Sequence, residues 1–364
     1  MMRMRPHENV PGGIAKRRLS VYTVRREICA RAYPATRLSK EGAAIRPRHG
    51  EVLMAFRDLM NNYFYGKQGK ADYTVADMPQ NRRQLFGEVL KVRWSGLFGV
   101  NLLYSIAWLP AIIWTFMNYL AMLGTLNGEL ELAEAAQEVR GLFSTYLLIL
   151  APCIAITGPF NAGATYVLRN WARDQHSFVL SDFKDAVKAN WKQALAISTI
   201  SGLLPTIVWT AWSFYSGMTS EAFIFFVPAG LVLLVGVVWF LSSTIMMDML
   251  ITYDLKLKDV IRNSILLTIG KLPFAALIRL IMLALPILGF LLMMLVPASQ
   301  GYVIPVTILL FAVFMTAFNK LIAVSYGNWL CETYINPRIE GAATNIGLRP
   351  DDWDDVTFLP DDDK

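Results

Sequence analysis

The sequence has few of the groups on which enzyme chemistry usually depends. Only 17% of its 364 residues are charged, and it contains three cysteines and three histidines. These six residues, Cys29, Cys153, Cys331, His7, His49 and His176, are isolated from one another, so neither a redox pair nor a zinc-ligand spacing is present. GxSxG, HExxH and Walker A motifs are also missing. The sequence therefore predicts no enzyme, no metal or other cofactor, and no transport energised by an ATPase of its own.

Apolar residues, in contrast, are in excess. They make up 55% of the chain, above the roughly 45–50% of soluble proteins, and the mean hydropathy is +0.40. A membrane-spanning helix needs about 20 mostly apolar residues. Six segments meet this requirement: Leu97–Met122, Phe143–Val167, Ala194–Tyr215, Phe223–Met247, Leu272–Val296 and Tyr302–Leu321. We expect an all-α, multi-pass membrane protein with six transmembrane helices.

The basic residues are distributed unevenly between these segments. Nineteen Lys and Arg precede the first span, and the following loops hold 1, 5, 0, 4 and 0. The positive-inside rule then predicts that both termini lie in the cytoplasm. The net charge of +6 would by itself allow a nucleic-acid partner. Its position instead favours contact with anionic lipids of the inner leaflet and no nucleic acid.

The composition also divides the chain into four parts. Residues 1–53 are expected to be a basic disordered extension, 54–95 a cytoplasmic amphipathic segment, 96–335 the six-helix transmembrane domain and 336–364 an acidic disordered tail. Residues 1–50 hold 12 Lys or Arg and 3 acids. A transit peptide is one alternative for this extension. Another is that the protein starts at Met54.

The second span contains the strongest local feature. Gly158, Pro159 and Asn161 combine helix-breaking residues with a side-chain amide. Breaks of this kind build binding sites in transporters, because a freed carbonyl in lipid needs another partner. Helix packing is the simpler interpretation, since small residues allow helices to approach closely. A pathway lined by Asn161 is the alternative.

Two cations lie within the predicted spans. Ionisable residues inside a membrane are functional candidates, but long side chains near a helix end can reach the headgroups. Lys320 is one residue from the cytoplasmic end of its span, so we expect it to reach the headgroups. Arg279 is seven residues from such an end, and Asp248 or Asp254 are conceivable partners for it.

Three cytoplasmic segments share a six-residue pattern: Phe86–Lys91, Phe183–Lys188 and Leu257–Arg262. In each, a bulky apolar residue is followed two positions later by an acid and five positions later by a base. Each segment begins 11 to 15 residues before an odd-numbered span. We therefore hypothesise a three-fold repeat of an amphipathic helix plus a transmembrane hairpin.

Several short motifs between Asn61 and Pro337 point to one family. They are Asn61–Lys67, Gly158-Pro159 with Tyr166–Arg169, Ser181-Asp182-Phe183, Asn190–Gln193, Leu255–Lys258, Asn263-Ser264, Gly270–Pro273 and Asn319-Lys320. In these positions the chain resembles the YesL-like family of bacterial membrane proteins, a domain of unknown function. The resemblance implies a polytopic protein whose gene often lies beside sugar ABC importers and polysaccharide-degrading enzymes. It supplies no catalytic residues.

With the resemblance, these features predict a protein of the bacterial plasma membrane that acts as an accessory or regulatory partner of ABC-type carbohydrate uptake. Contacts with importer subunits or anionic lipid are expected at a cytoplasmic face made by Arg169, Arg173, Asp182, Phe183, Asn190, Trp191, Lys256, Lys258 and Arg262. The alternative is a transporter or channel in its own right, with a site at the broken second helix made by Gly158, Pro159 and Asn161 and by the charge of Arg279. A membrane-bound enzyme is a weaker third interpretation.

Overall fold

The computed structural model describes residues 78–126, 128, 130–219 and 222–350. The predictions for residues 1–53, for a start at Met54, for the motif Asn61–Lys67 and for residues 351–364 lie outside these ranges. Within them the chain is helical and contains no strand. The all-α class is therefore confirmed for the described part.

The helices follow one another through short connections. In chain order they are α3 (Arg82–Val92), α4 (Trp94–Leu126), α5 (Leu132–Trp171), α6 (Val179–Met218), α7 (Phe226–Thr252), α8 (Leu257–Gly270), α9 (Leu272–Met282), α10 (Ala284–Leu295), α11 (Gln300–Leu310) and α12 (Thr316–Tyr334). A π-helical segment, Phe311–Met315, joins α11 to α12. Short 3-10 turns cover Phe223–Phe225, Pro297–Ser299 and Asn336–Arg338.

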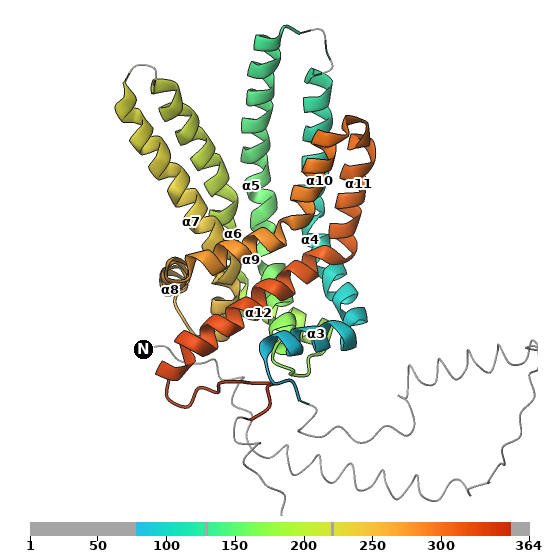
Figure 1. The fold of residues 1–364 in the computed structure, drawn as a ribbon, viewed down its shortest axis with the longest axis vertical. Helices are drawn as coiled ribbons and strands as arrows, with labels where there is room; N and C mark the ends of the chain where they lie inside the picture. The colour runs from blue at the N-terminus through green and yellow to red at the C-terminus, as the bar shows by residue number, and fades with distance from the viewer. Residues whose placement is uncertain (1–77, 127, 129, 220–221, 351–364) are drawn as a thin grey trace, which may run out of the picture. The chain divides into compact units, whose positions relative to one another are not determined.

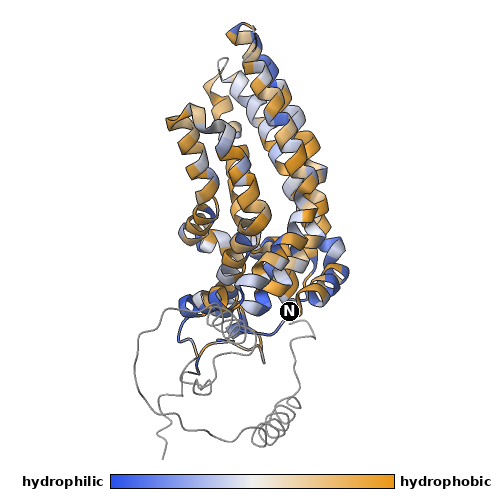
Figure 2. Ribbon diagram, turned by 90° about the vertical axis from the view of Figure 1, so that its right-hand side faces the viewer, coloured by the Kyte–Doolittle hydropathy of each residue, from blue (hydrophilic) through white to orange (hydrophobic). Residues whose placement is uncertain are grey.

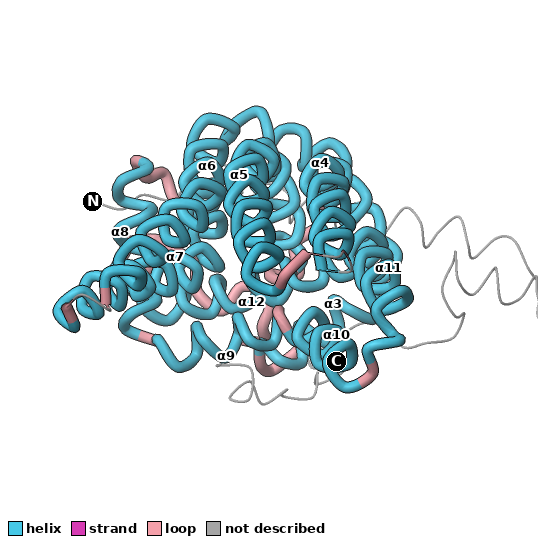
Figure 3. Tube along the Cα trace, turned by 90° about the horizontal axis from the view of Figure 1, so that it is seen from above, coloured by secondary structure: helices cyan, strands magenta, loops and turns pink. Residues whose placement is uncertain are grey.

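Four long helices, α4 to α7, stand upright, with α5 between α4 and α6 (Figure 1, Figure 3). The 40 residues of α5 correspond to a length of about 60 Å, twice the roughly 30 Å of a hydrocarbon core. Both α5 and α6 therefore extend beyond the bilayer. Tyr146 and Tyr166 of α5 lie about 30 Å apart along the helix, the separation expected of aromatic residues at the two membrane interfaces.

Five helices are long and apolar enough to cross a membrane, and the count rises to six if the bent pair α8 and α9 forms one span. The five helices contain the predicted spans that begin at Leu97, Phe143, Ala194, Phe223 and Tyr302. A polytopic helical membrane protein is therefore supported. The number of six spans and the orientation of the termini stay predictions.

The predicted fifth span, Leu272–Val296, is wrong as a single helix. Helix α9 ends at Met282 and α10 begins at Ala284. The ring of Pro286 would clash with the carbonyl four residues earlier, which belongs to Met282, so the helix ends there. Pro273 has the same effect at the start of α9, where α8 and α9 meet at 99°. Helices α10 and α11 then pair as a short hairpin (Figure 1).

The broken second helix, which the transporter alternative assumes, is not present. Helix α5 runs without interruption from Leu132 to Trp171, although Pro152 and Pro159 lie inside it. An interior proline removes one backbone hydrogen bond but does not end a helix that its neighbours hold in place. Close packing of α5 against α6, described below, provides that support.

The lower ends of the helices form a packed base. Leu85 and Val89 of α3 pack with Trp171 at the end of α5 and with Leu321 of α12. In Figure 1, α12 passes obliquely across the lower ends of the upright helices. Figure 2 shows hydrophobic residues along the upright helices and hydrophilic residues gathered at this base. We call this region the α3 end.

The predicted disordered tail begins too early at residue 336. Asn336 is buried, and Leu348 packs against the core cluster that contains Trp171. The backbone N–H of Arg349 donates to the carbonyl of Pro79 at 3.0 Å. Residues 336–350 are therefore part of the packed base, because these contacts join them to α3, α5 and α7.

The three segments of the proposed repeat all lie in helices but join their spans differently. The first occupies α3, and a single residue, Arg93, separates α3 from α4. The second lies inside the continuous helix α6. The third opens α8, which is separated from α9 by the 99° bend. The three-fold repeat stays a prediction.

Candidate functional site

Buried polar side chains gather where α5, α7 and α12 end. They are Arg169, Asn170, Arg173, Asp248, Thr252, Tyr253, Asn328, Glu332 and Asn336, each at most 8% exposed. We call them the polar cluster. The last carbonyls of a helix lack partners within it and carry partial negative charge, which favours cations there. Arg169 and Arg173 lie at such an end and meet groups from the other two helices.

The two arginines connect the three helices. Arg169 donates to the hydroxyl of Thr252 on α7 at 3.3 Å. The Nε of Arg173 donates to Oδ1 of Asn328 on α12 at 3.1 Å. The guanidinium carbon of Arg169 also lies 5.3 Å from the centroid of the Tyr166 ring. These contacts stabilise the crossing of α5, α7 and α12.

A second connection joins α7 to the residues after α12. The hydroxyl of Tyr253 donates to Oδ1 of Asn336 at 2.6 Å, and Nδ2 of Asn336 donates to the carbonyl of Ala343 at 2.9 Å. Burial raises the pKa of the Tyr253 phenol, and the nearby Asp248 carboxylate raises it further. Tyr253 therefore stays neutral and keeps donating its hydrogen bond throughout the physiological pH range.

Asp248 lies directly against the backbone of α12. A Cβ atom at Gly327 would collide with the Asp248 carboxylate, so glycine at this position allows the Asp248 side chain to lie against α12. Lys320, which is half-buried, lies within electrostatic range of both Asp248 and Arg279. From the sequence, Asp248 was expected only as a conceivable partner of Arg279. Its place in the polar cluster depends on the helix crossing.

Helix α3 is attached to this region by an ion pair between Arg82 and Glu332. Arg82 also donates to the carbonyl of Ile346 at 2.7 Å. Burial lowers the pKa of Arg82 and the Glu332 carboxylate opposes this change, so the guanidinium stays charged at neutral pH. Sequence reasoning missed this pair, whose members are 250 positions apart. The signal in the sequence that could have indicated a buried ion pair was Glu332, an acidic residue near the end of a long apolar stretch.

We expect Arg82→Met to release α3 from the base. Removing one partner of a largely buried ion pair costs about 3 kcal/mol, because the remaining charge loses its counter-ion. Hydrogen exchange followed by mass spectrometry should show faster exchange of the α3 amides. Arg83→Met, a change at the exposed neighbour on the same helix, is the matched control. Equal exchange of α3 in both variants would contradict the assignment.

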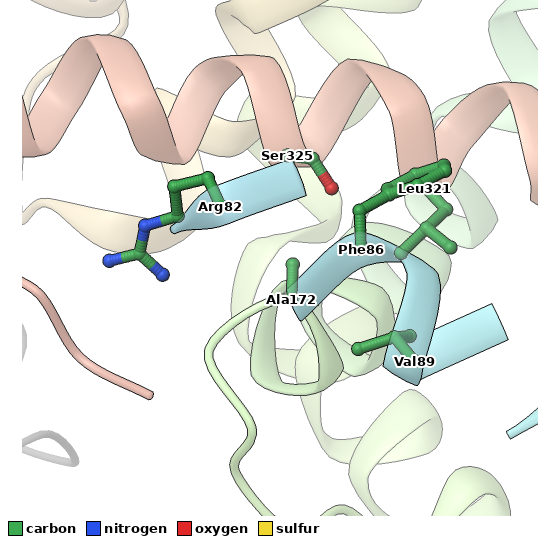
Figure 4. A pocket seen from close by; sticks show the side chains of 6 residues that line it. All are labelled: Arg82, Phe86, Val89, Ala172, Leu321 and Ser325. Atoms are coloured by element: carbon green, nitrogen blue, oxygen red, sulfur yellow. The ribbon is translucent and has the colours of Figure 1, made fainter. Parts of the chain in front are cut away.

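A small pocket lies between α3 and α12. It is lined by Arg82, Phe86, Val89, Ala172, Leu321 and Ser325, and its cavity volume of about 10 Å³ leaves room for about one water molecule (Figure 4). Drug-sized ligands occupy pockets of about 300–1,000 Å³, so this space is small for a substrate. In Figure 4 the Arg82 side chain extends away from Val89 and Leu321. Among the described residues, no group of three or more His, Cys, Asp or Glu could hold a metal ion.

The predicted pathway residues form a helix contact. A Cβ atom at Gly158 would lie 2.5 Å from the Ala194 carbonyl oxygen and 2.8 Å from the Ser198 hydroxyl. Pro159 follows inside the unbroken α5, and the Thr165 hydroxyl donates to the backbone carbonyl of Asn161 at 2.6 Å, with the Asn161 side-chain oxygen at 3.3 Å. These contacts favour the packing interpretation of this segment.

Arg279 connects α9 to α7. It donates to the hydroxyl of Ser243 at 2.7 Å and to the carbonyl of Phe240, and its guanidinium carbon lies 4.1 Å from the centroid of the Phe240 ring. The expectation of Asp248 or Asp254 as its partner is therefore wrong. Arg279 meets α7 at Phe240, which is about 12 Å along the helix from Asp248.

The predicted cytoplasmic contacts fall into two groups. Four of them, Arg169, Arg173, Phe183 and Asn190, are buried, so they cannot form a partner surface, and the prediction is corrected there. Their burial follows from the packing of α5 against α6 and α7. Asp182 is half-buried and accepts hydrogen bonds from Ser177 and from the Phe178 N–H. Trp191, Lys256, Lys258 and Arg262 are exposed.

Sequence reasoning also missed Asn101, a fully buried residue of α4. Its Nδ2 donates to the carbonyl of Ala312 at 2.6 Å, and its Oδ1 accepts from the N–H of Ala317 at 2.7 Å. Both partners belong to the π-helical segment or the turn after it. Near a π-helical segment, some backbone N–H and C=O groups lack the regular hydrogen bonds of an α-helix and need other partners. Asn101 supplies these partners from a helix 210 positions away.

A family model described as "Protein of unknown function, DUF624" matches residues 106–214. The match extends from the middle of α4 almost to the end of α6 and includes Gly158–Asn161, Arg169 and Arg173. No curated protein and no solved structure matches the chain. The comparisons thus relate α4 to α6 to a family that carries no assigned function.

Proposed function

We propose that the chain is an integral protein of the bacterial plasma membrane, with both termini in the cytoplasm, that assists ABC-type carbohydrate uptake as an accessory or regulatory partner. The main support is the closed contact at the predicted pathway. Gly158 packs on the backbone of Ala194, and Arg279 is engaged by α7. Neither group remains available to carry a solute, whereas several basic side chains at the α3 end stay exposed.

The charge distribution supports a cytoplasmic α3 end. The connection at 172–178 and the segment from 253 to 271 lie at this end and include Arg173, Lys256, Lys258, Arg262 and Lys271. At the opposite end, the connections at 127–131, 219–225 and 296–299 contain no Lys or Arg. Positive charge remains on the cytoplasmic side of bacterial membrane proteins.

The contact surface that we propose is α8 with the residue before it. Lys256, Lys258 and Arg262 are exposed there, and Val260 and Ser264 lie on the buried side of the helix. Exposed apolar side chains, such as Leu266, follow on the same short helix. A basic amphipathic helix at an inner membrane surface binds anionic lipid or an acidic protein partner. The carbohydrate system itself comes from the YesL-like resemblance.

A paired experiment tests this proposal. The purified chain in liposomes should move no sugar, and the same chain in native membranes should co-purify with subunits of a sugar ABC importer. The triple change Lys256→Glu, Lys258→Glu and Arg262→Glu should lower that recovery at least five-fold, since it reverses three charges on the contact surface. Arg140→Glu at the opposite end of the molecule is the control. Sugar flux by the isolated chain, or recovery that the triple change leaves unaltered, would refute the proposal.

A further inference from the structure

The first four turns of α6 carry an exposed row of lysines. Lys184, Lys188 and Lys192 follow one another at four-residue spacing and are all exposed. Leu180 begins the row at 68% exposure, and Phe178, which precedes the helix, is 69% exposed. Residues four apart lie on the same side of a helix, so these charges repel one another. We call these five residues the α6 ridge.

The bilayer cannot cover the beginning of this ridge. The apolar part of α6 starts at Ala194, and Leu180 lies 14 residues earlier, which is about 21 Å along the helix axis. The opposite side of the same turns is buried, since Phe183 and Ala186 belong to the protein core. Phe178 and Leu180 therefore form a small exposed apolar surface beside the lysine row, away from both lipid and core.

The described chain ends beside this surface. Gly347 has a φ of +80°, and a Cβ atom there would lie 2.6 Å from the carbonyl oxygen of Arg173, so the backbone passes directly over the end of α5. Leu348 and Val179 pack against the same core cluster, and Val179 is the first residue of α6. The described chain therefore passes over the connection between α5 and α6 three residues before it ends at Pro350.

The sequence after Pro350 complements the ridge. Residues 351–364 contain seven aspartates and one lysine, together with Trp353, Phe358 and Leu359. Fourteen extended residues reach up to about 46 Å, and Leu180 to Lys192 spans about 18 Å. Asp185 is the acid on the exposed side of these turns, so the three ridge lysines leave an excess of positive charge. A covalently attached acidic segment is present at an effective concentration in the millimolar range.

We propose that the C-terminal segment 351–364 binds the α6 ridge of its own chain. Its aspartates pair with the lysine row, and its aromatic side chains cover Phe178 and Leu180. The proposal does not depend on the uptake partner, because both components belong to this chain.

Zero-length cross-linking tests the contact, because a carbodiimide joins only a lysine and a carboxylate that touch. The full-length protein in discs of uncharged lipid should give peptides that connect Lys184 or Lys188 to the aspartates of 351–363. Changing Lys188 and Lys192 to glutamine keeps the reactive amine of Lys184 but removes two ridge charges, so it should lower the yield of the Lys184 product at least three-fold. Changing Lys256 and Lys258, which are also exposed at the α3 end, should leave this yield unaltered. Absence of the cross-linked peptides from the unaltered protein would overturn the proposal.

A second measurement distinguishes other occupants of the ridge. With all seven aspartates changed to asparagine, acetylation of Lys184 should become at least three-fold faster relative to that of Lys258. If the ratio of the two acetylation rates is unchanged, the proposal is overturned. It is also overturned if anionic lipid protects Lys184 whether or not the aspartates have been changed. Mixed samples of isotopically light and heavy protein should give cross-links within one copy. Predominantly mixed cross-links would show a contact between copies and overturn the assignment to a single chain.

Discussion

Asn101→Leu is expected to lower the midpoint of thermal unfolding in detergent by roughly 10 °C. The change removes the hydrogen bonds to the Ala312 carbonyl and to the Ala317 N–H in the packed base. Each buried backbone group that loses its partner costs about 1–3 kcal/mol, so the two together cost about 2–6 kcal/mol. Leucine fills a similar volume, which keeps the loss of packing small.

The same helix offers a matched control. Asn118 of α4 is also buried, and within the described residues its Oδ1 has no hydrogen-bond partner. Asn118→Leu replaces an amide whose oxygen is unsatisfied with an apolar group, so we expect unchanged or higher stability. If both leucine variants unfold at the same temperature, Asn101 does not stabilise the π-helical segment.

The second large effect is expected from the contact between α5 and α6. A Cβ atom at Gly202 would lie 2.5 Å from the Ala151 carbonyl oxygen and 3.1 Å from its Cα, and Gly158 is equally crowded. These neighbours are backbone atoms, which cannot move aside without separating the helices. Gly158→Ala and Gly202→Ala should each cost about 3 kcal/mol, the upper range for overpacking.

At two other glycines of these helices, substitution by alanine is expected to raise the stability of the protein, not to lower it. A Cβ atom at Gly141 of α5 or at Gly217 of α6 would meet nothing within 4 Å. Alanine is favoured over glycine inside a helix by about 1 kcal/mol, so Gly141→Ala and Gly217→Ala should stabilise the protein slightly. Thermal unfolding of the four variants measures the difference. Equal effects at all four positions would show that α5 and α6 do not pack as described.

These substitutions also separate the two interpretations of Gly158. If the residue provides close packing, Gly158→Ala should lower stability to the same extent as Gly202→Ala, although Gly202 was in no predicted pathway. A pathway residue would instead change solute movement while stability stayed near that of the original protein. The similar surroundings of the two glycines favour packing.

The predictable part of the fold rested on local rules. Apolar length placed five spans within long helices, because a bilayer requires about 20 apolar residues whatever surrounds them. The fifth span failed through another local rule, since Pro286 ends α9 at Met282. The presence of a proline does not by itself predict where a helix ends, because Pro159 lies inside the unbroken helix α5. Helix α5 stays continuous at Pro159 because it packs closely against α6.

The candidate site was far less predictable. Arg169 and Arg173 were identified from their charge and assigned to the surface, yet both are buried. Their partners come from α7 and α12, about 80 and 155 positions later in the chain. No periodicity connects residues at such separations. Arg82, Glu332 and Asn101 were missed for the same reason.

The sequence by itself determined that this is a helical membrane protein, and it predicted which end faces the cytoplasm, because hydrophobic length and basic residues act locally on each segment. Only the tertiary structure decided which charges are buried. Arg173 and Lys184 look alike in the sequence, but Arg173 lies where three helix ends meet, and Lys184 lies on the outer side of α6. That difference arises from helix crossings, in which a close contact such as that of Asp248 with Gly327 determines what each side chain faces.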